Sequence, residues 1–260
     1  MNAAQAVFHA MVYPRRAPMD DQESLHLYDA QQDSLVFQNQ TLTAWHWGKR
    51  GPRVLLVHGW ESRSTHWHAW VPVLLAAGYR VTSLDLPAHG HSSGRSTHVV
   101  QAGQAVLALE QSIGPFDAVI GHSMGSAALL YAFAHDLKVE ASVHIAGPVS
   151  LRGVLERAGM AGQLDPVERR ALAHSFARHH DLDLDVMELP SLLRGFRHPA
   201  LIHHDAQDKE IPLSESQALA AAWPGSQLNA ISGLGHRRIL RDPELIQQTV
   251  SWLAQQLSAS

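Results

Sequence analysis

Residues 121–125, Gly-His-Ser-Met-Gly, decide the fold class of this chain. They follow an apolar stretch at residues 116–120 and precede a helix-forming stretch at residues 127–133. This order predicts a strand, a tight turn with Ser123 at its apex, and a helix. A serine in so tight a turn needs neighbours without side chains, because its backbone lies close to the residues two before and two after it. The turn lifts the hydroxyl above the strand, and the amides that begin the next helix point to the same place.

A serine hydroxyl is a poor nucleophile at neutral pH, so it needs a base, and the base needs a group that orients it. Two later segments offer such groups. Residues 200–204 form a short apolar run that predicts a strand, and this run leads into Asp205 and Asp208. Residues 227–231 predict another strand, followed by a glycine-containing turn and His236. A histidine in an exposed loop after a strand serves function more often than packing.

The ordered set of these stretches resembles the α/β-hydrolase-fold serine hydrolases, an esterase-like family with a small helical cap. The resemblance spans residues 41–258. The motifs that carry it are VHGW at 57–60, DLPAHGHS at 85–92, GHSMG at 121–125, DKEIP at 208–212 and GH at 235–236.

The resemblance implies a role for each member of a catalytic triad. Ser123 is the expected nucleophile, and His236 is the expected general base and then general acid. Asp208 is the expected orienting carboxylate, because family members place the acid just before the pattern x-x-Ile/Val-Pro. Asp205 remains the alternative acid, since both aspartates follow the same predicted strand; its other role would be to cap the turn.

The same chemistry needs donors for the oxyanion that forms on the attacked carbonyl. Two preplaced N–H groups are worth on the order of 100-fold or more in rate. The amide of Met124 is one expected donor, because it follows the nucleophile directly. The resemblance places the second donor at Trp60, in the loop after the predicted strand at residues 53–57. His58 and Gly59 are expected to shape that loop.

A serine at position 123 selects acyl substrates. Haloalkane dehalogenases and epoxide hydrolases of this fold carry an aspartate there, whereas a serine forms an acyl-enzyme. We therefore expect a serine hydrolase that cleaves carboxylic esters of small to medium acyl substrates without a cofactor. The same triad could act on thioesters, lactones, amides or the carbon–carbon bonds of diketones. An alternative of another class is a non-catalytic ligand-binding protein on the same fold.

Composition narrows the choice of partners and compartment. The chain has 260 residues, a net charge of −4 and no cysteine. We expect no nucleic acid or membrane partner, because no basic field exists and no apolar run reaches about 18 residues. The absence of cysteine excludes disulfides and thiolate catalysis, and with an N-terminus unlike a signal peptide it fits a cytoplasmic protein. The oligomeric state stays open.

Nineteen histidines are an unusual number and raise the question of a metal site. His66 and His68 would diverge on a helix, and His203 and His204 would face opposite sides of a strand. No metal-binding motif of the H-E-x-x-H kind is present. We therefore expect no metal, with most histidines on the surface or in loops.

Strands and helices alternate from Thr41 onward, which predicts an α/β fold with a mostly parallel sheet and helices on both faces. About fifty residues without a strand pattern interrupt this alternation, far more than the dozen or so that a crossover needs. We expect a first core part at 1–147, a helical cap insertion at 148–198 and a second core part at 199–260. The forty residues before Thr41 are expected to wrap the core or add an edge strand. The predicted strands are 41–47, 53–57, 80–84, 117–120, 141–145, 201–204 and 227–231.

Overall fold

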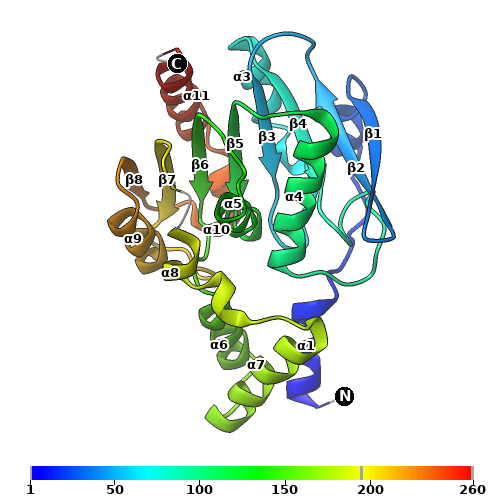
Figure 1. The fold of residues 1–260 in the computed structure, drawn as a ribbon, viewed down its shortest axis with the longest axis vertical. Helices are drawn as coiled ribbons and strands as arrows, with labels where there is room; N and C mark the ends of the chain where they lie inside the picture. The colour runs from blue at the N-terminus through cyan, green and yellow to red at the C-terminus, as the bar shows by residue number, and fades with distance from the viewer. Residues whose placement is uncertain (1, 194–195, 259–260) are drawn as a thin grey trace.

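The computed structural model describes residues 2–193 and 196–258, which form one eight-stranded sheet with helices on both sides (Figure 1). The strand order across the sheet is β1-β2-β4-β3-β5-β6-β7-β8. Strands β1 and β2 pair antiparallel, as do β2 and β4, and every other pair is parallel. The predicted fold class is thereby confirmed. The strands are β1 (Gln31–Phe37), β2 (Gln40–Trp47), β3 (Arg53–Val57), β4 (Arg80–Asp85), β5 (Ala118–His122), β6 (Ala141–Ile145), β7 (Ala200–Asp205) and β8 (Ser226–Ile231).

Strands β2 to β8 match the seven predicted strands within two residues at each end. The first predicted strand, β2, is not the edge of the sheet. Strand β1 pairs along its whole length, from Gln31 opposite His46 to Phe37 opposite Gln40. The segment before Thr41 thus adds an edge strand, which is one of the two expected possibilities.

The sheet separates two apolar layers, and successive residues of a strand contribute to opposite ones. In β3, Leu55 and Val57 belong to the layer under α4 (Val99–Ile113), α5 (Met124–Ala134) and α9 (Leu213–Ala222). Val54 and Leu56 belong to the layer under α3 (Val71–Ala76) and α11 (Pro243–Leu257). Because both faces are covered, the parallel strands are apolar on both sides, which is why their sequences are nearly continuous apolar runs.

A helical insertion connects β6 to β7 and lies beyond the end of the sheet (Figure 1). It contains α6 (Leu151–Ala161), α7 (Pro166–His180), the 3₁₀ helix η2 (Leu184–Met187) and α8 (Leu189–Leu192). The N-terminal helix α1 (Ala3–Val12) packs against α6 and α7, with the ring of Phe8 meeting that of His179 edge-on at 5.4 Å. The start of the chain therefore contributes to the same helical layer as the insertion. A second short helix, α2 (Asp21–His26), precedes β1.

Within the described part of the chain, no helix has both the length and the apolarity needed to cross a bilayer.

Fewer histidines are exposed than the expectation of surface or loop positions suggests. Only five of the nineteen are exposed, and seven are buried. Burial disfavours the charged imidazolium, and it lowers the pKa of His58, His122 and His144 from 6.5 to about 3. Composition cannot show this, since imidazole is found both in cores and on surfaces. The buried histidines are His58, His89, His122, His144, His203, His204 and His236.

These buried imidazoles predict that the fold loses stability in mild acid. The unfolded chain takes up protons below about pH 6.5, whereas His58, His122 and His144 resist protonation in the folded state until about pH 3. Each lowers the free energy of unfolding by about 1.4 kcal/mol per pH unit across that window. Urea unfolding at pH 7.5, 6 and 5 should therefore show a falling midpoint. A midpoint that stays constant down to pH 5 would contradict this account.

Candidate active site

Ser123 occupies a strained turn between β5 and α5. Its backbone has φ 52° and ψ −122°, in a region that residues with side chains rarely adopt. The two flanking glycines make the turn possible. A Cβ atom on Gly125 would lie 2.1 Å from the carbonyl oxygen of Val57, and one on Gly121 would lie 2.7 Å from the amide nitrogen of Ser126. Helix α5 can therefore approach β3 closely enough to hold the serine above the sheet.

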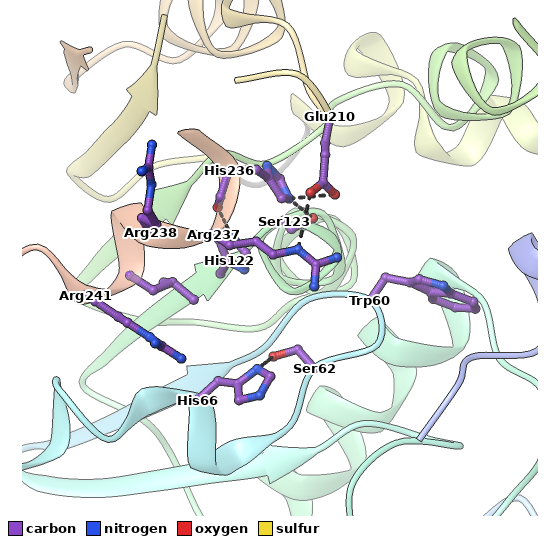
Figure 2. Close-up of a pocket in the computed structure, with 11 residues that line it drawn as sticks. Trp60, Ser62, His66, His122, Ser123, Glu210, His236, Arg237, Arg238 and Arg241 are labelled. Carbon is purple, nitrogen blue, oxygen red and sulfur yellow. Dashed lines mark hydrogen bonds and ion pairs between the residues drawn. The ribbon is translucent and has the colours of Figure 1, made fainter. Parts of the chain in front are cut away.

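The structure brings Ser123, His236 and Asp208 into one hydrogen-bonded series (Figure 2 shows the first two). The distance from His236 Nε2 to Ser123 Oγ is 2.9 Å. The distance from His236 Nδ1 to Asp208 Oδ2 is 2.6 Å. Because Nδ1–H donates to the carboxylate, Nε2 is free to accept the proton of the serine hydroxyl. The three residues are 113 and 28 positions apart along the chain, so only the sheet unites them.

The environment of Asp208 favours a carboxylate. Its side chain is fully buried, and its Oδ1 accepts hydrogen bonds from the amides of Glu210 at 2.7 Å and Ile211 at 3.0 Å. Burial alone would raise the pKa of Asp208. The hydrogen bond from His236 and the two amides outweigh this effect, so the pKa lies below its usual value. Asp208 can thus stabilise a positive charge on the imidazole.

Asp205, the alternative acid, is engaged elsewhere. Its carboxylate accepts the amide of Gln207 at 2.7 Å and the amide of Leu234 at 2.6 Å. It therefore ties the loop after β7 to the loop that carries His236. This position matches the turn-capping role considered for it, with an added contact across the two loops.

His122 is a residue that the sequence analysis did not single out. Its Nε2–H donates to the backbone carbonyl of His236 at 2.8 Å, and the two rings lie 4.9 Å apart. Since burial keeps the pKa of His122 at about 3, its imidazole stays neutral. The bond anchors the helix α10 (Gly235–Arg238) that carries His236. The position directly before Ser123 was the only signal for this role.

The loop after β3 lies against the serine. A Cβ atom on Gly59 would be 2.9 Å from the Cβ of Ser123, so the loop that continues into Trp60 passes close to the serine. The amide of Met124 is the first of α5. Within residues 2–193 and 196–258, neither this amide nor that of Trp60 donates to a protein acceptor. Both N–H groups are thus available to a ligand, and their role as an oxyanion hole stays a prediction.

Two buried side chains hold that loop in shape. His58 Nδ1–H donates to the Gly59 carbonyl at 2.8 Å, and its Nε2 accepts the Leu86 amide at 3.0 Å. Asp85 accepts the amides of Ser64 at 2.8 Å and His91 at 3.0 Å. The motif at residues 85–92 therefore helps to hold this loop in place.

Two cavities meet at the serine, and Trp60, Ser123, Glu210 and His236 line both of them. The larger cavity, of about 560 Å³, extends under the helical insertion and is lined mostly by apolar side chains such as Val154, Met160 and Phe176. The smaller, of about 320 Å³, is lined mostly by polar and charged residues, among them Ser62, His66 and three arginines (Figure 2). In the described ranges, no group of three or more His, Asp or Glu side chains is arranged to hold a metal ion.

The chain belongs to the α/β hydrolase fold family, whose model matches residues 52–184. It is 51% identical over 43 residues to the pimeloyl-[acyl-carrier protein] methyl ester esterase of Methylococcus capsulatus, which is 16% of either chain. It is 31% identical over 113 residues to epoxide hydrolase B of Mycobacterium tuberculosis, which is 41% of this chain and 32% of that protein. The matches thus span one third or less of these two relatives.

Solved structures share the fold over nearly the whole chain. An esterase of Pyrococcus furiosus superposes with a TM-score of 0.72 at 18% identity and covers 95% of this chain and 98% of its own. This likeness concerns the fold alone.

The contact at Gly125 predicts a large effect of one methyl group. Gly125→Ala should cost several kcal/mol, of the order of 3 or more, or prevent folding, because the new Cβ meets the β3 backbone. Gly153→Ala is the matched control, since it lies near the start of α6 and its Cβ would meet only side-chain atoms, those of Ser150 at 3.1 Å, Arg157 at 3.2 Å and Glu215 at 3.4 Å. Urea unfolding should place the control within about 1 kcal/mol of the parent. Equal stability of the two variants would refute the steric argument.

Proposed function

We propose that the protein hydrolyses carboxylic esters of small to medium acyl substrates through an acyl-enzyme. The hydrogen-bonded series Asp208–His236–Ser123 at the junction of the two cavities carries this proposal. The family match and the similarity to proteins named as esterases support it. Ser123 is the proposed nucleophile, His236 the base and then acid, and Asp208 the orienting carboxylate.

The acylation step follows from the positions of the atoms. Ser123 Oγ attacks the ester carbonyl carbon, and its proton passes to His236 Nε2, 2.9 Å away. Asp208 stabilises the imidazolium that forms. The amides of Trp60 and Met124 receive the oxyanion, where preplaced donors are worth on the order of 100-fold or more. The tetrahedral intermediate then collapses, the carbon–oxygen bond to the alcohol breaks, and His236 returns the proton to the leaving alkoxide.

Deacylation repeats the same steps with water. His236 takes a proton from a water molecule, whose oxygen attacks the acyl carbon of the Ser123 ester. The second intermediate collapses to the carboxylic acid, and the proton returns to Ser123 Oγ. No further group is needed for the electrons and protons to balance.

Epoxide opening is the second candidate, because one relative is named as an epoxide hydrolase. The nucleophile argues against it. Attack of Ser123 Oγ on an epoxide carbon would leave an ether, which has no carbonyl for water to attack. A carboxylate nucleophile leaves an ester, which water can cleave. Thioesters, lactones, amides and diketones remain substrates that the same serine could attack.

The proposed cap is the helical insertion at residues 148–198. Helix α6 lines the larger cavity together with Ser123, and α1 contributes Met11 to the same lining. A volume of about 560 Å³, bordered by α6, supports a preference for small to medium acyl chains.

The assignment of roles predicts the activities of four variants. Ser123→Ala, His236→Ala and Asp208→Asn should each lower kcat/KM for p-nitrophenyl butyrate by about 10³-fold or more. Asp205→Asn should lower kcat/KM less, because the Asp205 carboxylate accepts hydrogen bonds from backbone amides and does not contact the His236 imidazole. Ser232→Ala replaces an exposed serine outside the hydrogen-bonded series and is the control for effects of substitution on folding. A folded Asp205→Asn protein as inactive as Asp208→Asn would overturn the choice of acid.

The cavity under α6 predicts that chain-length preference can be shifted. Val154→Phe would fill part of the lining and should lower kcat/KM for p-nitrophenyl octanoate relative to the acetate by about tenfold. Steady-state kinetics on the acetate, butyrate and octanoate measure the change. An unaltered octanoate-to-acetate ratio would show that the acyl chain does not lie beneath Val154.

A further inference from the structure

The smaller cavity beside Ser123 is basic in a protein that is acidic overall. Three arginines within residues 237–241 line it, and Glu210 is the one acidic residue in the described lining. The chain as a whole has a net charge of −4, so this local excess of positive charge runs against the average. Figure 2 shows the guanidinium groups of Arg237 and Arg241 in the space between His236 and the loop that carries Ser62 and His66.

The three arginines differ in what they already bind. Arg237 Nε lies 3.3 Å from Glu210 Oε1 and forms an ion pair with it. Arg238 donates to the carbonyls of Leu234 at 2.9 Å and Gly233 at 3.0 Å, so its guanidinium is already engaged by the loop before α10. Arg241 has an exposed side chain and, in the ranges that the structure describes, no carboxylate partner. It is thus a cation available to a ligand.

Glu23, which contacts the lining residue His66, is already bound by several groups. Glu23 Oε1 lies 3.0 Å from His66 Nε2, 3.6 Å from Arg63 Nε and 2.9 Å from the Thr65 hydroxyl. The other ring nitrogen of His66 lies 2.6 Å from Ser62 Oγ. Glu23 therefore neutralises Arg63 and leaves Arg241 unpaired.

We propose that this cavity binds an anionic group on the alcohol side of the substrate. This inference rests on the proposed function. It gives the substrate class as esters between an apolar acyl chain and an alcohol that carries a carboxylate or a phosphate. Arg241 is the principal contact. Guanidinium groups suit both anions, because their fixed fork of donors matches two oxygens at once and stays charged at every working pH.

The position of the two cavities sets the orientation of the ester. The leaving oxygen must receive its proton from His236, and the chain that continues from His236 to Arg241 lines the basic cavity. The apolar cavity instead includes Ala127 and Met124, whose amide is one of the two proposed oxyanion donors, while Trp60, the other, lines both cavities. Arg157 and Lys209 also line it, and Arg157 is paired with Glu215 at 2.5 Å. The acyl chain therefore enters under α6, and the alcohol lies against Arg241.

The test compares esters that differ by one charge. The butyryl ester of glycolate carries a carboxylate on its alcohol, and the butyryl ester of glycolamide is its neutral match. The parent protein should prefer the anionic ester by about tenfold in kcat/KM, as expected for one charge-assisted contact. The butyryl ester of 2-hydroxyethyl phosphate, run beside them, tells whether phosphate or carboxylate is the better anion.

Three variants assign the preference to individual charges. Arg241→Gln should lower the ratio of kcat/KM for the anionic ester to kcat/KM for the neutral ester to a value between about 1 and about 3. Glu210→Gln removes the opposing charge and should raise the ratio. Arg50→Gln removes the same charge from an exposed position just before β3, at the opposite end of the sheet, and should leave it unchanged. Raising the ionic strength should lower the ratio in the parent, because salt screens exposed charges.

Several outcomes would overturn the proposal. One is a parent ratio at or below one, and another is a ratio that Arg241→Gln leaves unchanged. A stronger preference for monoethyl succinate over its amide would place the anion on the acyl side, near Lys209. If the neutral ester is still cleaved in a Ser123-dependent way, only the substrate class fails. If no ester is cleaved in that way, the proposed function itself fails.

Discussion

The close approach of helix α5 to strand β3 is the constraint on which the rest of this structure depends. It is possible only because position 125 has no side chain to meet the carbonyl of Val57. That contact fixes the height of Ser123 and its positive φ. The strain in the turn is held by the two apolar layers that cover the sheet on both faces. Each other part of the site is placed relative to this one rigid turn.

The loops that meet Ser123 are pinned by buried polar groups rather than by apolar packing. His122 anchors the backbone of His236, and Asp205 anchors the amide of Leu234 two residues earlier. His58 holds the loop that carries Trp60. Neutral imidazoles suit this task, because each offers one donor and one acceptor in a fixed plane. The same burial that makes them useful anchors makes the fold sensitive to acid.

The sequence was most informative where a local pattern has a steric or periodic cause. The core strands, the turn at Ser123 and the segments that bring Asp208 and His236 together follow from apolar runs and glycine positions. Helix α1 could not be foreseen, because its partners α6 and α7 lie about 150 residues later and its only local signal is the capping box of Asn2 and Gln5. Strand β1 is mostly exposed and lacks a clear alternation. The burial of His144 or His58 depends on which strands become neighbours, which composition does not encode.

The central claim is that Ser123 is activated by His236. Its most direct test is covalent labelling with a fluorophosphonate, followed by mass spectrometry of the labelled peptide. The account predicts one adduct per chain, located on Ser123 and formed far more slowly once His236 is replaced by alanine. An adduct on another residue, or labelling of Ser123 at an unchanged rate without the imidazole, would contradict it.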